Sequence, residues 1–132
     1  MIPKFRMWNR ITSKLHCVYG LYFDSKEVQY TDEVGILRFI KFENTILMQS
    51  TGLKDKNGKE IFEGDIIKNG EAVVDVKNHP TLGFYTTPNG VERFFGDNTS
   101  IRDFNNDVED FSDVTEIIGN VYENPELLED NS

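Results

Sequence analysis

The chain has 132 residues, a single cysteine and a formal net charge of −9. This length suits one domain spanning residues 1–132, and folding at this size buries about two-thirds of the unfolded surface, enough for a core without disulfides. No apolar run approaches the roughly 18 residues that cross a bilayer, and no apolar stretch follows a basic start. We therefore expect neither a membrane span nor a signal peptide. The lone Cys17 cannot form an internal disulfide, which favours a reduced, cytoplasmic compartment.

The charge is distributed unevenly along the chain. Residues 1–96 are nearly neutral, whereas residues 97–132 hold 1 basic and 11 acidic side chains, a balance of −10. Affinity for DNA or RNA comes mainly from Lys and Arg that neutralise phosphates, so we expect no direct nucleic-acid binding. An acidic quarter of this kind is typical of a solvated surface. It can also meet a basic protein partner or imitate a nucleic acid.

The first third of the chain reads as strands separated by short turns. Runs of β-branched and aromatic residues predict strands at 4–8, 27–30 and 36–42. Between the first two of these, residues 14–18 and 21–23 form either a hairpin around Tyr19-Gly20 or one strand with a glycine bulge.

Residues 46–67 predict several tight reversals in succession. The apolar run 46–48 is followed by Asn57-Gly58, a strong hairpin signal because both residues tolerate positive φ. A second reversal at Gly64 leaves a short rung at 59–62, and Ile66 opens a new strand. Such closely spaced glycine turns are how a small barrel or a curled sheet reverses direction.

The remaining strands are predicted around further turn signals. A second Asn-Gly turn, Asn69-Gly70, predicts a hairpin between residues 65–68 and 72–77. Residues 78–83 read as a loop, since Pro80 cannot donate to a ladder. The next expected hairpin pairs 84–86 with 91–95 around Pro88-Asn89-Gly90.

The end of the chain combines an acidic loop, a strand and a helix. The polar segment at about 97–113 is expected to be a loop, and residues 114–122 form the last strand. Asn124 as N-cap and Pro125 at the first position predict a short C-terminal helix at about 125–130. The expected fold is mainly β: one domain with a curled antiparallel sheet or a partly open small barrel and a short C-terminal helix.

The residue types that catalysis needs do not form a recognisable constellation. Glu60, Glu63 and Asp65 cluster beside Gly64, but carboxylates flanking a glycine more often accept backbone N–H bonds and hold the turn. His16 and Cys17 are adjacent and point to opposite faces of a strand, so they do not act together. His79 is remote in sequence, and we expect Cys17 to be a buried structural residue.

The acidic loop also resembles a calcium-binding loop in part. Acidic and amide side chains alternate from 103 to 109, as ligands do in an EF-hand. Val108 stands where that loop needs Gly, and Val114 stands where it needs a bidentate Glu. We therefore expect a solvated acidic loop, with no metal and no cofactor.

Three motifs carry a resemblance to a known family. They are residues 4–9 (KFRMWN), the stretch 46–67, and residues 117–127 (IIGNVYENPEL). With these motifs the chain resembles the YopX family of small phage and prophage proteins over nearly its whole length. The resemblance implies a β-rich fold, a phage origin and a bacterial host cytoplasm, and it implies no particular reaction. In the first motif, Asn9 follows Trp8 where the family pattern has an acid.

The functional hypothesis that follows is a non-enzymatic phage or prophage accessory protein. It would act by binding a protein partner or by self-association into a homo-oligomer. The alternatives are an acidic nucleic-acid mimic that inhibits a host DNA-handling or defence enzyme, and a small metal-dependent hydrolase that uses the carboxylates at 60–65 and 97–113. The candidate interaction surface pairs a basic hairpin tip with the acidic loop, and its residues are Lys54, Lys56, Lys59, Asp103, Asp107, Glu109 and Asp110.

Overall fold

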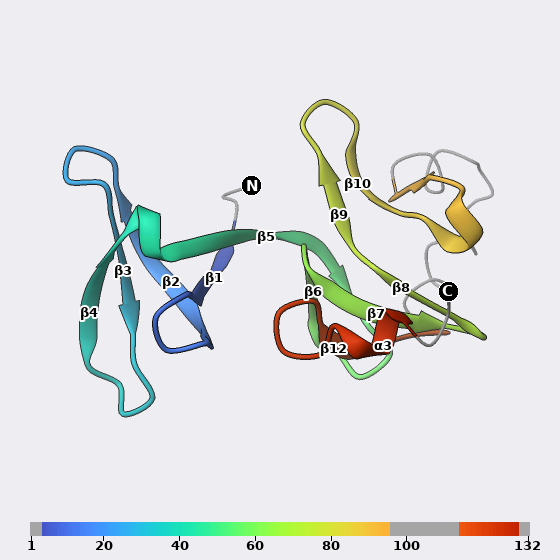
Figure 1. The fold of residues 1–132 in the computed structure, drawn as a ribbon, viewed down its shortest axis with the longest axis horizontal. Coiled ribbons are helices and arrows are strands. Elements are labelled where there is room, and N and C mark those ends of the chain that lie inside the picture. Colours follow the sequence, from blue (N-terminus) through green and yellow to red (C-terminus); the bar gives the residue numbers. More distant parts are fainter. Residues whose placement is uncertain (1–3, 96–113, 130–132) are drawn as a thin grey trace. The chain divides into compact units, whose positions relative to one another are not determined.

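The computed structural model describes residues 4–95 and 114–129. Most of these residues lie in antiparallel strands, and one short α-helix, α3 (Glu126–Glu129), lies near the C-terminus (Figure 1). Contacts divide the chain into two compact units, unit 1 (residues 1–50) and unit 2 (residues 51–132). The predicted mainly β fold with a short C-terminal helix is confirmed. Within the described residues the sheets do not close into a barrel.

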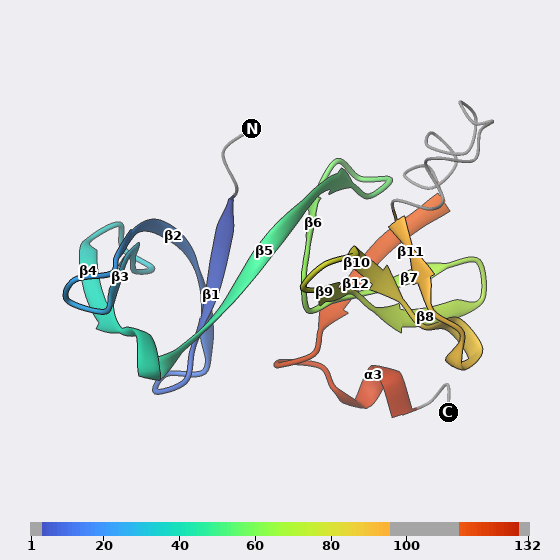
Figure 2. The same cartoon turned by 90° about the horizontal axis from the view of Figure 1, so that it is seen from above.

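Unit 1 is an antiparallel sheet in which β4 is an edge strand. The strand order is β4-β3-β2-β1-β5, and β6 extends this order from the part of β5 that lies in unit 2. A 3-10 helix, η1 (Phe42–Asn44), links β4 to β5. Figure 2 shows β2, β3 and β4 curving away from β1. The strands are β1 (Phe5–Asn9), β2 (Lys14–Tyr22), β3 (Glu27–Thr31), β4 (Leu37–Lys41) and β5 (Thr45–Lys54).

One face of this sheet forms the core of unit 1. Met7, Val28, Tyr30 and Ile40 are buried there. Successive strand residues point to opposite faces, so Val28 and Tyr30 share a face and Gln29 lies on the other. We call the core side the inner face and the opposite side the outer face. Each buried aliphatic side chain contributes about 1.5–3 kcal/mol relative to exposure.

Strand β2 is continuous and contains a bulge, the second of the two forms predicted for it. Its register with β3 shifts between Val18 and Gly20. Val18 and Leu21 both pack against the core, although strict alternation would place residues three apart on opposite faces. The extra residue, Tyr19, resets the alternation.

Asn9 holds the turn after β1. Asn9 is buried, and its Oδ1 accepts the backbone N–H groups of Ile11 and Thr12 at 2.9 and 3.1 Å. An amide oxygen fills this acceptor role as a carboxylate would.

Unit 2 contains two three-stranded sheets, ordered β12-β7-β8 and β11-β10-β9. Its core is formed by Ile61, Ile67 and Val76. At Val76 the chain leaves the first sheet and enters the second, so the strand predicted over 72–77 is divided and the loop predicted at 78–83 begins later. The elements are β6 (Glu60–Phe62), β7 (Asp65–Asn69), β8 (Ala72–Asp75), β9 (Lys77–His79), β10 (Gly83–Thr86), η2 (Pro88–Gly90), β11 (Arg93–Phe94) and β12 (Thr115–Asn120).

The first Asn-Gly turn is present, but its backbone differs from the expectation. Only Gly58 has positive φ, 82°, and Asn57 does not. The Gly58 N–H donates to the Asp55 carbonyl at 3.0 Å, and the Asp55 N–H donates to the Lys59 carbonyl. This is a three-residue loop in which a type I turn is followed by a left-handed glycine.

The hairpin between β7 and β8 is confirmed, and its turn is shifted by one residue. Asn69 pairs directly with Ala72, so the two loop residues are Gly70 and Glu71. Gly70 has a φ of 64°. Glycine at the first of two loop positions is typical of a type II′ turn, whereas the sequence had indicated Asn69-Gly70 as the central pair.

Asp55 connects this part of the chain to a strand 62 residues away. Its side chain is 3% exposed. One carboxylate oxygen accepts the N–H groups of Asn57 and Lys59 at 2.9 Å, and the other accepts that of Ile117 at 3.1 Å. Burial acts to raise the pKa of Asp55, but the three N–H donors together outweigh it and hold the pKa below its ordinary value.

Asp65 holds the second reversal in a similar way. It is 2% exposed, and its Oδ2 accepts the Phe62 N–H at 2.7 Å. The Gly64 N–H donates to the Val76 carbonyl, and the Gly64 carbonyl accepts the Val121 N–H. The expectation that a carboxylate beside Gly64 holds the turn is therefore confirmed for Asp65.

Gly119 leaves room for a side chain that organises the end of β12. A Cβ at this position would lie 2.6 Å from Oδ1 of Asn124, much closer than van der Waals contact allows. The same Oδ1 accepts the Asn120 N–H at 3.3 Å. The register with β7 shifts between Ile117 and Gly119, so the glycine also lies in a bulge.

We predict that Asp55→Asn lowers the free energy of unfolding at pH 7 by about 1–3 kcal/mol, because a buried N–H loses its acceptor. The folded pKa of Asp55 lies below its unfolded value, so the stabilisation is complete above roughly pH 4 and is lost as the pH falls through the folded pKa. Urea unfolding at several pH values measures this, with the exposed Asp24→Asn as control. An equal loss for both variants at all pH values would contradict the role of Asp55.

We predict that Gly119→Ala destabilises unit 2 by about 1–3 kcal/mol through overpacking against Asn124. Asn124→Ala removes Oδ1, the atom nearest to the added methyl group. The double variant should therefore lose less stability than the two single variants lose in sum. Thermal unfolding of the four proteins gives the coupling energy. Strict additivity would show that the two residues do not clash.

Candidate functional site

The outer face of unit 1 presents exposed aromatic and aliphatic side chains. Tyr22, Leu37 and Phe39 are 44%, 47% and 54% exposed, and we call them the aromatic face. The rings of Tyr22 and Phe39 are 5.6 Å apart. The Tyr22 hydroxyl donates to Oε1 of Gln29 at 2.9 Å, which fixes the ring over the sheet.

Tyr22 lies where it does because of Gly20. A Cβ at Gly20 would come within 3.3 Å of the Tyr22 ring. Gly20 pairs with Gln29, and Gln29 pairs with Phe39. Gly20, Gln29 and Phe39 therefore form one row across three strands, and the Tyr22 ring lies against this row.

The aromatic face ends at the edge strand β4. Within residues 4–95 and 114–129, no strand pairs with the second side of β4. Ile40 is buried, and the other four residues of the strand are exposed. Arg38 and Lys41 form ion pairs with Asp32 and Glu27, with N–O distances of 2.5 and 3.7 Å. Charged residues on an edge strand discourage uncontrolled pairing with other chains.

A polar hollow of about 340 Å³ lies at the end of the inner face. Tyr30 and Arg38 are cross-strand neighbours, and the ring of His16 lies 4.7 Å from that of Tyr30. Three neighbouring strands thus contribute side chains to the lining. The lining residues are Asn9, Thr12, Lys14, His16, Tyr30, Asp32, Glu33 and Arg38.

Asp32 is held in place in the hollow by hydrogen bonds to both of its carboxylate oxygens. Its Oδ1 accepts the backbone N–H groups of Val34 and Ile36 at 3.0 and 2.9 Å, and its Oδ2 accepts Nε of Arg38 at 2.5 Å. The bond from Arg38, followed by the backbone bonds, holds the pKa of Asp32 below its ordinary value. Asp32 in turn raises the pKa of Arg38. Both groups are therefore charged at neutral pH.

A second ion pair lies at the rim of the hollow. Nζ of Lys14 donates to Oε2 of Glu33 at 2.5 Å, and both side chains are more than half exposed. The pair lowers the pKa of Glu33 and raises the pKa of Lys14. Because solvent screens this pair, it orders the rim more than it stabilises the fold.

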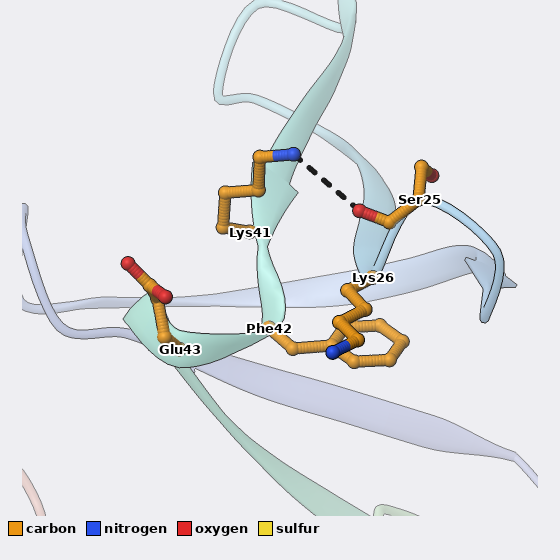
Figure 3. Close-up of a pocket in the computed structure, with 5 residues that line it drawn as sticks. All are labelled: Ser25, Lys26, Lys41, Phe42 and Glu43. Carbon is orange, nitrogen blue, oxygen red and sulfur yellow. Dashed lines mark hydrogen bonds between the residues drawn. The ribbon is translucent and has the colours of Figure 1, made fainter.

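Another hollow, of about 510 Å³, lies where β4 meets η1. Figure 3 shows Lys26 and Phe42 on one side of it and Glu43 on the other. Nζ of Lys41 donates to the Ser25 carbonyl at 3.4 Å (Figure 3). Lys26 has a φ of 57°, and its carbonyl accepts the Phe42 N–H. The hollow therefore belongs to the turn that closes the end of the sheet.

The predicted interaction surface is only partly within the described residues. Lys54, Lys56 and Lys59 are exposed around the β5–β6 turn. Lys56 lies 3.5 Å from the carboxylate of Glu116 on β12, so one member of the basic cluster already has an acidic neighbour. The acidic members lie outside the described residues, as does most of the loop examined for calcium binding; they are Asp103, Asp107, Glu109 and Asp110.

The expectation that Cys17 is buried is wrong. Cys17 is exposed, because it lies on the outer face opposite Arg6, whereas its half-buried neighbour His16 packs on Tyr30. His79 belongs to unit 2, where its Nδ1 accepts the N–H groups of Thr81 and Leu82 at 3.0 Å. In the part of the chain that the structure describes, no three His, Cys, Asp or Glu residues are grouped to hold a metal ion.

The sequence did not indicate the hollow or the aromatic face. Both depend on which residues of β2, β3 and β4 stand side by side, and the bulge at Tyr19 changes that register. The only local signal was Asp32 before Gly35, which is typical of a turn held by an aspartate.

None of the described helices is long and apolar enough to span a membrane.

The fold and these surfaces define a class of small antiparallel β proteins with open sheets. The chain belongs to the YopX family, because the pattern of that family, described as YopX protein, matches residues 4–129. Protein EF1440 from Enterococcus faecalis has a similar crystal structure, with a TM-score of 0.61 and 28% sequence identity. The similarity covers 97% of this chain and 99% of that chain. No curated protein matches the chain.

We predict that Cys17 of the native protein reacts fully with the thiol reagent DTNB, because its side chain is exposed. The rate should lie within about tenfold of that of the urea-unfolded protein, and Cys17→Ser should not react. Strong protection of the native thiol would contradict the position of Cys17 on the outer face.

Proposed function

We propose that this YopX protein is a phage or prophage accessory protein that binds another protein and catalyses no reaction. The proposal rests on the edge strand β4, whose second side pairs with no strand among the described residues. Its exposed residue Phe39 contacts Tyr22, and Leu37 is exposed two residues earlier. We place its action in the cytoplasm of the bacterial host.

An edge strand next to aromatic side chains suits recognition of a protein. A partner strand added to β4 would gain main-chain hydrogen bonds, and side-chain contacts would supply specificity. Tyr22 and Phe39 are large, and Tyr22 is held in place, so little conformational entropy is lost when they are covered. Contiguous exposed apolar surface of this kind is characteristic of interaction sites.

Two of the groups considered for catalysis have structural uses, which supports a non-enzymatic role. Asp65 accepts the Phe62 N–H, and His79 accepts two backbone N–H groups. A general base needs a free acceptor directed at its substrate. Each of these two residues uses at least one acceptor atom to hold the backbone.

Self-association is one form of the proposal. In a homo-oligomer, β4 of one copy would pair with β4 of another, and the two aromatic faces would become continuous. The basic cluster of Lys54, Lys56 and Lys59 offers a further contact for the acidic segment of a second copy.

A second candidate is the acidic nucleic-acid mimic, which the balance of −10 over residues 97–132 favours. Such an inhibitor would occupy the basic groove of a host DNA-handling or defence enzyme, and its affinity would fall steeply with salt. Binding through the aromatic face depends on apolar contacts and tolerates salt. The salt dependence of complex formation therefore separates the two candidates.

We predict that the Tyr22→Ser, Phe39→Ser double variant binds its partner, or a second copy of itself, much more weakly. Its dissociation constant should be at least about tenfold larger. Light scattering measures self-association, and pull-down from host lysate at low and high salt measures binding to other proteins. Leu82→Ser, at an equally exposed position in unit 2, is the matched control. Salt-sensitive capture that survives the double substitution would favour the mimic and contradict the aromatic face.

A further inference from the structure

In the polar hollow of unit 1, several acceptors are occupied and part of one donor, Arg38, is unused. The Asp32 carboxylate accepts three donors, and Oδ1 of Asn9 accepts two. The Glu33 carboxylate is paired with Lys14. Among the described residues Arg38 uses only Nε, in its bond to Asp32. Its two terminal amino groups are therefore available to a ligand that accepts hydrogen bonds.

The Arg38 guanidinium is oriented before any ligand arrives. Nε is fixed by Asp32, and Asp32 is fixed by the backbone of Val34 and Ile36. A guanidinium held by Nε presents its two terminal amino groups as a planar fork. That fork matches the two oxygens of a carboxylate, and its preset orientation reduces the entropy lost on binding.

The charges around the hollow disfavour a ligand with two negative charges. Lys14 and Arg38 are balanced by Glu33 and Asp32. A doubly charged phosphate would be repelled by two nearby carboxylates, whereas a carboxylate bound by Arg38 carries half that charge. His16 and Tyr30 border the same space and offer an aromatic wall to the carbon atoms of the ligand.

We propose that this hollow is a binding site for a carboxylate, held by the terminal amino groups of Arg38 beside His16 and Tyr30. The carboxylate belongs either to a free small molecule or to an acidic side chain of a protein. The site is independent of the proposed function. Arg38 faces the Tyr30 side of the sheet, and the aromatic face lies on the opposite side.

The test is titration of the ¹⁵N-labelled full chain, followed by NMR, with three probes. Butyrate represents a free carboxylate with one negative charge, N-acetylglutamate α-amide represents an acidic side chain, and N-acetylglutamine α-amide is the uncharged control. We expect at least one carboxylate probe to cause saturable shifts at His16, Tyr30 and Arg38, and the uncharged probe to cause none. Which carboxylate binds more tightly identifies the source.

Variants then assign the site to Arg38. Arg38→Gln should weaken binding at least about tenfold, because it removes a charge-assisted bidentate contact. Arg38→Lys keeps the charge without the fork and should also weaken binding. If the spectra show that Arg38→Gln perturbs the fold, Arg38→Lys provides the test instead. The control is Lys41→Gln, which removes a cation from the same strand but outside the hollow, and it should bind as the parent does.

Three results would overturn the carboxylate site. One is the absence of saturable shifts with either carboxylate probe. Another is equal weakening by Arg38→Gln and Lys41→Gln, which would indicate attraction by net charge alone. The third is equal binding of the uncharged probe. None of these results depends on the Tyr22 and Phe39 variants. Failure of the carboxylate site would therefore leave the proposed protein-binding role to be decided by its own test.

Discussion

The buried carboxylate of Asp55 is the interaction on which unit 2 most depends. It joins a local turn to a strand 62 residues away through the Ile117 N–H, while the N–H of the neighbouring Lys56 donates to the Thr115 carbonyl. A carboxylate removed from water is costly unless its oxygens are satisfied, and here three backbone donors satisfy them. The same bonds set the turn and the position of β12, so neither feature forms correctly without the other.

In unit 1 the alternation of strand residues separates two surfaces on one thin sheet. Odd and even positions of β4 place Arg38 beside the polar hollow and Phe39 on the aromatic face. The bulge at Tyr19 allows both Val18 and Leu21 to reach the core while Tyr22 turns outward. The two proposed binding sites therefore lie on opposite faces of one sheet.

The positions of turns and strands could be predicted from sequence, because glycine, asparagine and proline act locally. The turn types were less accessible. In the two Asn-Gly pairs only the glycines, Gly58 and Gly70, take positive φ, whereas both residues of each pair were expected to occupy the two central positions of the turn. The predicted burial of Cys17 was wrong, because the alternation of side chains along β2 decides which face of the sheet Cys17 occupies. The Asp55–Ile117 bond and the Arg38 row could not be foreseen, because they join residues that become neighbours only through tertiary pairing. Residues 103–110 of the predicted surface lie outside the described residues.

The buried carboxylate of Asp55 ties the turn after β5 to the distant strand β12. Native-state hydrogen exchange of the Asn57, Lys59 and Ile117 amides tests this connection most directly, because all three donate to Asp55. The account predicts that these amides are strongly protected and exchange with a common opening free energy, as one cooperative unit. Rapid, independent exchange of Ile117 and the two turn amides would contradict it.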